Sequence, residues 1–350
     1  MLWLAIPAAL IVTLLLTPIT IKLAYKLGAV DIPNERKVHQ GAKPRIGGLA
    51  IYCGFVAGAL LLGQYSWQVA GLLIGASLVM LGGFYDDLKG ISPKGKLFIQ
   101  FIAALILIKC GYCFEFITNP FTGGVISLGF LAVPLTLIWL IGISNAINLV
   151  DGLDGLSAGI SAIAAVTMSV VCYSQGNFLA SGLAAVLAAA AFGFLRYNFF
   201  PSKTFMGDCG SLFLGFCLGA IAVLGLSKGA TMVSIFIPLI ILGIPIFDTM
   251  FAIIRRLFQH KPIFEADKGH LHHCLLGLGL SHAHVVLVIY AISFLMGLCA
   301  VLMAVLTTPQ AIVLLIIITV CTFVGADALG VLRGRGILQA KKQQHSNKGV

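Results

Sequence analysis

Charged side chains and tryptophan are scarce in this chain. Only 10% of its 350 residues are Asp, Glu, Lys or Arg, and three are Trp, whereas 59% are hydrophobic. An ordinary globular protein carries about 25% charged residues. The shortage of charge therefore excludes a soluble globular domain, because too few polar side chains are available to cover its surface.

Long polar segments are lacking as well. Apolar runs close to the roughly 20 residues that a helix needs to cross a bilayer recur almost from end to end. The sequence thus predicts an all-α polytopic membrane protein with eleven transmembrane helices, near residues 3–21, 46–63, 68–85, 96–114, 127–146, 155–173, 177–195, 209–227, 229–254, 283–306 and 309–332. We expect one transmembrane domain, 1–332, and a basic cytoplasmic tail, 333–350. The first run has no basic start and no small-residue cleavage site, so we expect it to be retained.

Lysine and arginine indicate the orientation, because cytoplasmic loops are enriched in them. If the N-terminus lies outside, 20 of the 22 Lys and Arg residues fall on the cytoplasmic side, and only Lys109 and Lys228 do not. We therefore expect a cytoplasmic C-terminus. The net charge of +10 then reflects basic loops and does not call for a nucleic-acid partner.

The nine cysteines are scattered and lie mostly inside apolar runs. Buried cysteine usually behaves as a small hydrophobe, so we expect these side chains to serve packing. Cys110 and Cys113 form a CxxC pair in an outer loop. A redox or metal role for this pair stays open, although no second pair lies nearby.

Two adjacent carboxylates, Asp86 and Asp87, end the third apolar run in the segment GGFYDDLKG. Carboxylates at a membrane boundary are costly to desolvate unless a positive charge compensates them. Mg²⁺ is a suitable partner, since it binds one or two carboxylates together with substrate phosphates. The alternative is a solvated helix end paired with Lys89.

The next acidic loop, NAINLVDGLDG, contains no Lys or Arg but has two Asn, two Asp and two Gly residues. Amides and carboxylates offer hydrogen-bonding and metal-ligand oxygens, and glycine permits close approach of the backbone to a ligand. A simple turn between helices would favour the same residue types. Other short loops, such as GQYSWQ, lack this composition, which favours a binding role.

Two further segments on the same side carry polar residues. FMGDCGS places Asp208 at a predicted helix N-terminus, where an N-cap is the simplest role, although such termini also bind phosphate. The loop from Arg255 to His273 contains basic residues, which can clamp a diphosphate, and it also contains the sequence HLHH, whose histidines can donate hydrogen bonds or take up protons near pH 7;. A zinc site is an alternative there, but the surrounding carboxylates favour a hard cation.

Asp248 lies about two turns inside the ninth apolar run. An ionisable group at that depth is a functional candidate by default. Pairing with Arg255 and capping of a helix break after Pro245 are equally good explanations. The role of Asp248 therefore stays open.

Five motifs resemble those of the polyprenyl-phosphate N-acetylhexosamine-1-phosphate transferase family, and they occur in the family's order. They are KPRIGG at 43–48, DDLKG at 86–90, NAINLVDGLDGL at 145–156, FMGDCGS at 205–211 and HLHH at 270–273. The chain resembles most the bacterial branch that acts on undecaprenyl phosphate and UDP-GlcNAc. The peptidoglycan branch has three histidines followed by Phe-Glu, whereas HLHH is followed here by Cys-Leu.

The resemblance implies transfer of GlcNAc-1-phosphate from UDP-GlcNAc to undecaprenyl phosphate with release of UMP. It also implies a multi-pass protein of the bacterial inner membrane, with its active site on the cytoplasmic face, that begins synthesis of a cell-envelope polysaccharide. The expected cofactor is Mg²⁺, with Mn²⁺ as an alternative. The expected partners are the two substrates and membrane lipid. A homodimer is left open as an alternative to a monomer.

The same resemblance assigns roles to individual residues. Asp208 and one or both of Asp86 and Asp87 would hold the metal, and one of the latter two would keep the lipid phosphate deprotonated. Asp154 and Phe205 would contact uracil. The rest of the predicted substrate-binding set is Lys43, Asn148 and Asp151 for the nucleotide sugar, and Arg256, His270, His272 and His273 for sugar and diphosphate.

Two alternatives remain at this point. The first is the same reaction with another donor, such as UDP-MurNAc-pentapeptide. The second is a secondary transporter, but transporters place polar residues on broken helices near the middle of the bilayer. In this chain the polar motifs gather on one face, which disfavours transport.

Overall fold

Helices make up most of the protein. The structure, a computed structural model, describes residues 2–31, 41–118, 124–226, 236–259 and 269–331. Within these ranges the α-helices are α1 (Leu2–Leu27), α2 (Gly48–Leu61), α3 (Trp67–Lys89), α4 (Pro93–Lys109), α5 (Ala132–Val150), α6 (Leu156–Ser174), α7 (Phe178–Asn198), α8 (Gly207–Leu226), α9 (Phe236–Ile241), α10 (Gly243–Phe258), α11 (Leu271–Gly277), α12 (His282–Val305) and α13 (Thr308–Ala328), with a 3₁₀ turn at Gly129–Leu131.

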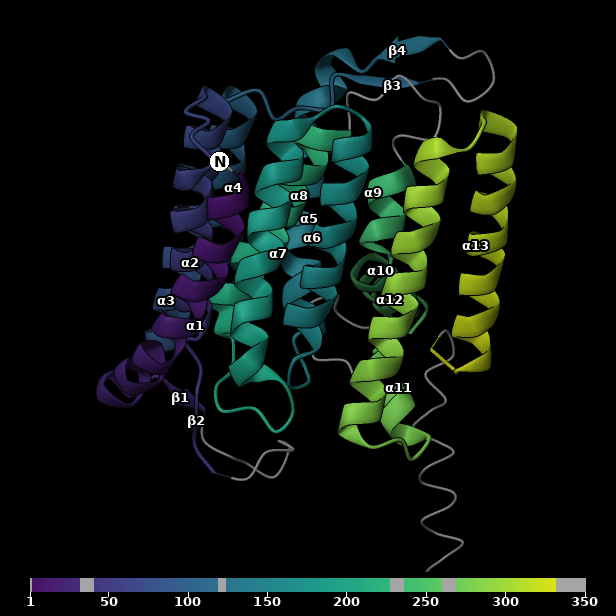
Figure 1. The fold of residues 1–350 in the computed structure, drawn as a ribbon. Coiled ribbons are helices and arrows are strands. Elements are labelled where there is room, and N and C mark those ends of the chain that lie inside the picture. Colours follow the sequence, from purple (N-terminus) through teal and green to yellow (C-terminus); the bar gives the residue numbers. More distant parts are fainter. Residues whose placement is uncertain (1, 32–40, 119–123, 227–235, 260–268, 332–350) are drawn as a thin grey trace, which may run out of the picture.

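Two short antiparallel hairpins mark the two ends of the bundle. Strand β1 (Val30–Asp31) pairs with β2 (Lys43–Pro44), and β3 (Phe116–Thr118) pairs with β4 (Val125–Ser127). Figure 1 shows β3–β4 at one end, together with the start of α1, and β1–β2 with α11 at the other. The C-terminal end of α13 also lies at the β1–β2 end.

Among the helices that the structure describes, eight are long and apolar enough to cross a membrane: α1, α3, α5 with its preceding turn, α6, α7, α8, α12 and α13. The prediction of an all-α, multi-pass membrane protein is therefore confirmed. Helices α2 and α4 correspond to the second and fourth predicted spans but have 14 and 17 residues. The expected tail, 333–350, lies outside the described residues.

The predicted ninth span, 229–254, is interrupted in its described part. Two helices, α9 and α10, occupy residues 236–258, and Leu242 separates them. Pro245 explains the break, because proline donates no backbone hydrogen bond and its ring crowds the carbonyl four residues earlier, at Ile241. The residues before 236 in this span lie outside the described ranges.

Helix α8 forms the centre of the bundle, and glycines permit close contacts with its neighbours. In its membrane-length segment, 89% of the residues are buried inside the protein. A Cβ atom at Gly48 of α2 would lie 2.2 Å from the Gly210 backbone, and one at Gly83 of α3 would lie 2.6 Å from the Asp208 backbone. Glycine therefore allows α2 and α3 to reach the first turn of α8.

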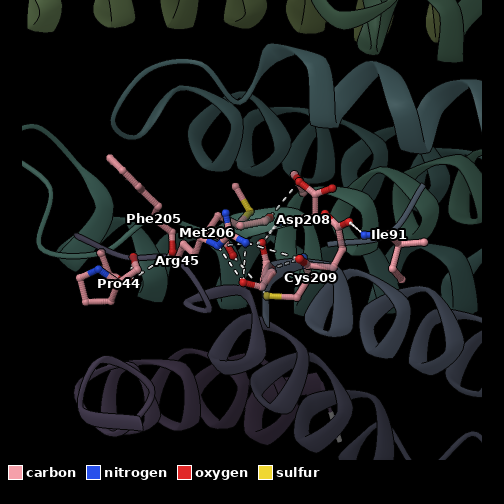
Figure 2. A network of polar contacts seen from close by, with 12 residues as sticks. Pro44, Arg45, Ile91, Phe205, Met206, Asp208 and Cys209 are labelled. Atoms are coloured by element: carbon pink, nitrogen blue, oxygen red, sulfur yellow. Dashed lines mark hydrogen bonds and ion pairs between the residues drawn. The ribbon is translucent and has the colours of Figure 1, made fainter. Parts of the chain in front are cut away.

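Main-chain hydrogen bonds join the segment before α2 to the segment before α8. The Phe205 amide donates to the Pro44 carbonyl at 2.7 Å, and the Gly47 amide donates to the Phe205 carbonyl at 3.1 Å. The Gly48 amide donates to Met206 at 2.9 Å. The KPRIGG and FMGDCGS motifs thus lie side by side, although about 160 residues separate them (Figure 2).

Candidate active site

Asp87 organises the start of α8. Its carboxylate is 5% exposed and accepts the backbone N–H groups of Asp208 at 3.1 Å and Cys209 at 3.0 Å. First-turn N–H groups have no partner within their own helix, so Asp87 provides the cap from α3. Arg45 holds the same turn of α3 by donating to the Asp87 carbonyl at 2.8 Å (Figure 2).

The interpretation of Asp208 as the N-cap of its own helix is therefore wrong. Asp208 lies in the first turn of α8, and its carboxylate accepts hydrogen bonds from Lys96 at 2.6 Å and Asn148 at 3.0 Å. Because Asp87 already satisfies the backbone donors, the Asp208 carboxylate is available for side-chain and ligand contacts.

Lys96 joins two of the predicted carboxylates. Its ammonium lies 2.7 Å from Asp86 and 2.6 Å from Asp208. The other Asp86 oxygen accepts the Ile91 amide at 2.6 Å. Thus the carboxylates of α3 and α8 converge on one positive charge at the start of α4.

This convergence bears on the predicted metal. Both carboxylates are ion-paired with Lys96. Mg²⁺ characteristically takes one or two carboxylates and completes its shell with water and phosphate. Among the described residues, no group of three or more His, Cys, Asp or Glu side chains is already placed around a metal position. Asp86 and Asp208 are two carboxylates of the kind that Mg²⁺ takes, and binding of a metal by them stays a prediction;.

The loop between α5 and α6 brings two more carboxylates to this end of the bundle. Asp154 pairs with Lys43 at 3.2 Å and accepts the Ser202 amide at 3.0 Å. Asp151 is partly exposed to the cavity yet closely surrounded by protein. Burial, assisted by the negative charges of Asp208, Asp87 and Asp154, raises the pKa of Asp151 to about 8;.

An aromatic and a cationic group face each other beside Asp154. The Lys43 ammonium lies 4.9 Å from the centre of the Phe205 ring and 2.8 Å from the Ser202 hydroxyl. An aromatic ring with cations and acceptors at its edge is suited to a flat heterocycle that also carries phosphate.

These groups line one polar cavity of about 830 Å³. Of the predicted residues, its lining includes Lys43, Asp87, Asn148, Asp151, Asp154, Phe205, Asp208 and His273. The volume is within the range of pockets that hold a small-molecule ligand. These eight residues come from all five motifs, which lie far apart in the sequence, and the fold gathers them around one cavity.

Four predicted residues lie outside the described lining of this cavity. Asp86 is nearby through Lys96, whereas Arg256 is buried in the last turn of α10. His270 contacts Asp248, and His272 packs against Gly152 of the α5–α6 loop. Burial, together with the neighbouring His273, lowers the pKa of His272 to about 3;. The roles predicted for all twelve site residues, inside and outside this lining, stay predictions.

Sequence reasoning missed several residues of the site. From the sequence, Lys96 is only one of the 20 Lys and Arg residues expected on the cytoplasmic side, yet it bridges two carboxylates. His282 accepts the Asp154 amide at 3.1 Å and stacks on Phe200. Asn198 lines the cavity, and its buried side-chain oxygen has no hydrogen-bond partner among the described residues. The only sequence signal for them was their place on the predicted cytoplasmic side.

The fold and the site together define a multi-pass membrane protein with a carboxylate-rich polar cavity at one end of a helical bundle. A family model described as glycosyl transferase family 4 matches residues 69–226. A Bacillus subtilis (strain 168) protein named probable undecaprenyl-phosphate N-acetylglucosaminyl 1-phosphate transferase is 44% identical, over 93% of this chain and 91% of its own length. The chain belongs to this family of transferases.

More distant relatives widen the comparison. A decaprenyl-phosphate N-acetylglucosaminephosphotransferase of Mycolicibacterium smegmatis is 36% identical, over 77% of this chain and 73% of its own. A phospho-N-acetylmuramoyl-pentapeptide-transferase of Halalkalibacterium halodurans is 32% identical, over 85% of this chain and 96% of its own length. The relatives named for N-acetylglucosamine are thus the more similar of these three.

Proposed function

We propose that this protein is an enzyme that transfers GlcNAc-1-phosphate from UDP-GlcNAc to undecaprenyl phosphate and releases UMP. This reaction would be the first membrane step in the synthesis of a cell-envelope polysaccharide. The observation that carries the proposal is the cavity in which a lysine-aromatic pair and a cluster of carboxylates face the same space. The 44% identity to the Bacillus subtilis protein supports this donor and this acceptor.

The nucleoside would bind at the Phe205 end of the cavity. The Phe205 ring offers a face for uracil, and Lys43 and Asp154 lie beside it. The unpartnered oxygen of Asn198 is an acceptor for a donor group of the nucleoside;. A buried polar site of this kind discriminates strongly, because a wrong base would leave these groups unpaired.

The diphosphate would lie toward Asp208, Asp86 and Lys96. Asp208 and Asp86 would hold Mg²⁺, or Mn²⁺ in its place, and Asp87 would orient Asp208 by fixing the first turn of α8. The metal would supply charge neutralisation on the diphosphate. Phosphoryl transfer needs positioning and electrostatic stabilisation more than covalent help, so the lipid phosphate oxygen attacks the β-phosphorus and the bond to UMP breaks.

We further propose eleven membrane crossings, with the N-terminus outside and the C-terminus in the cytoplasm of a bacterium. Positions of Lys and Arg support this orientation;. The start of α1 and the end of α13 lie at opposite ends of the bundle, as an odd number of crossings requires (Figure 1). The cavity would then open to the cytoplasm, where nucleotide sugars are made.

The reaction is tested with the purified full-length protein in detergent micelles, given UDP-GlcNAc, undecaprenyl phosphate and Mg²⁺. We expect UMP release together with transfer of labelled sugar to the lipid, and neither without acceptor lipid. UDP-MurNAc-pentapeptide as the donor should give at most a few per cent of this rate. Faster turnover of the pentapeptide donor would reassign the substrate, and flux into vesicles without chemistry would support transport instead.

The orientation is tested by cysteine labelling in intact cells on a background without native cysteines. Single cysteines at Ser66 and Ser174 should react with a membrane-impermeant reagent, whereas those at Ser92 and Lys203 should react only after lysis. Labelling of position 92 from outside would contradict both the topology and the use of a cytoplasmic donor.

A further inference from the structure

The carboxylate of Asp248 lies at the first turn of α11, a helix that follows α10 along the chain. One oxygen accepts the Leu271 amide at 2.8 Å, and the other lies 2.8 Å from Nδ1 of His270. The Asp248 and His270 side chains are only 4% and 7% exposed. Since a carboxylate only accepts hydrogen bonds, Nδ1 of His270 carries the proton in this pair.

Helix α11 depends on support from elsewhere. It has seven residues, and its own N-cap residue, His270, makes no side-chain capping bond. Isolated helices shorter than about 12 residues are marginal in water, and a negative charge near a helix N-terminus is stabilising. Asp248 therefore supplies from α10 both the cap and the charge that α11 lacks.

The first turn of α11 separates two cavities of different chemistry. Leu271 and Asp248 line an apolar cavity of about 420 Å³ between α10, α12 and α13. Two residues further on, His273 lines the polar cavity. The His272 ring fills the space against Gly152, where an added Cβ would lie 2.6 Å from Nε2. A shift of this turn would therefore move the histidines relative to the Asp151–Asp154 loop.

We propose that Asp248 is a positioning residue for the transfer reaction. It holds the first turn of α11 through Leu271 and His270, and it thereby sets the place of His273 in the polar cavity without contacting substrate. In this arrangement His270 is part of the support and not part of the substrate-binding surface. The inference rests on the proposed function, because His273 matters for turnover only if the polar cavity is the active site.

The test compares Asp248→Asn and His270→Gln with Thr249→Val in the full-length protein. Asn keeps an acceptor for the Leu271 amide but removes the charge that pairs with His270. We expect the first two variants to lower the kcat of UMP release at least tenfold. Thr249 is the matched control, because its buried hydroxyl has no hydrogen-bond partner among the described residues. Thr249→Val should turn over like the unmodified protein.

Hydrogen-deuterium exchange distinguishes positioning from general damage. In Asp248→Asn and in His270→Gln, amides 271–277 should exchange at least tenfold faster, while the amides of α5 and α8 keep their protection. The double variant should be no worse than the more affected single variant, because both changes break one contact. Unchanged exchange in α11, or faster exchange throughout the bundle, would overturn the proposal.

The exchange measurement needs no substrate, so it tests the support of α11 by Asp248 separately from the proposed transfer reaction. If the unmodified protein releases no UMP, the proposed function fails, while the exchange of α11 still tests its support by Asp248. If the unmodified protein turns over and both variants match it, only the positioning role is contradicted. Should Asp248→Asn insert poorly, His270→Gln breaks the same pair from the α11 side.

Discussion

Helices α8 and α13 are both long and apolar, and they differ most in what surrounds them. In the membrane-length segment of α8, 89% of the residues are buried inside the protein, compared with 17% in α13. Yet α13 is the more hydrophobic of the two. Lipid chains are as apolar as leucine, so the greater hydrophobicity of α13 does not require a place in the core and suits a surface that faces lipid.

The same two helices differ in their small and polar residues. Gly210 and Gly215 of α8 leave no room for a Cβ atom beside α2 and α5, whereas no described atom lies within 4 Å of a Cβ built at Gly325 of α13. Helix α8 also carries Asp208 and Ser211, which both bond to Asn148. Helix α8 thus packs closely against its neighbours and also carries polar side chains of the candidate site. Helix α13 has no such close contact at Gly325.

Matched aspartate substitutions should give the largest contrast. Asp208→Asn keeps the side-chain volume and one oxygen but removes the charge that faces Lys96 and the proposed metal. We therefore expect kcat to fall about 10²–10³-fold, which corresponds to about 3–4 kcal/mol of lost electrostatic stabilisation. Asp327→Asn, in α13, should change kcat less than twofold. UMP release per folded protein measures the kcat of both variants. Full activity of Asp208→Asn would contradict a role for this α8 carboxylate in the reaction.

Matched glycine substitutions should give a smaller contrast, in stability. A Cβ at Gly210 would lie 2.1 Å from the Met206 side chain and 2.7 Å from the Gly48 backbone. Overpacking of this kind costs about 1–3 kcal/mol, so Gly210→Ala should lower the thermal unfolding temperature in detergent. Gly325→Ala should leave it unchanged or raise it slightly. Equal effects would mean that burial does not distinguish the two helices energetically.

A pair of histidines extends the comparison to α11 and the start of α12. The pKa of buried His272 is lowered to about 3, whereas an unfolded histidine has a pKa of about 6.5. Between these values only the unfolded chain takes up the proton, so stability is complete above pH 6.5 and falls as the pH drops toward 3. From pH 7 to pH 5 the expected loss is on the order of 1–2 kcal/mol.

His272→Gln should remove that part of the acid sensitivity, whereas His284→Gln, at an exposed position of α12, should retain it. Unfolding temperatures measured at pH 7 and pH 5 test the difference. If both variants keep the full acid sensitivity of the unmodified protein, protonation of His272 does not limit stability.

The sequence sufficed to predict an all-α multi-pass membrane protein and to single out the loops that meet around the polar cavity, because hydrophobic runs and motif composition are local properties. It could not predict that Asp87 caps α8, since this contact depends on how α3 and α8 cross at Gly83. Lys96 and Asp208 are likewise 112 residues apart. Partner choice between distant segments follows from three-dimensional packing, and neither charge pattern nor periodicity records it.

The main-chain hydrogen bonds between Pro44–Gly48 and Phe205–Met206 have a consequence for how the gene for this protein can vary. Bonds made by backbone atoms tolerate many changes of side chain, but they depend on the number of residues between fixed points. Inserting or deleting a single codon between Lys43 and Gly48 would slide one segment past the other and separate the Lys43 ammonium from the Phe205 ring. Natural variants should therefore differ here by substitution and keep the spacing constant.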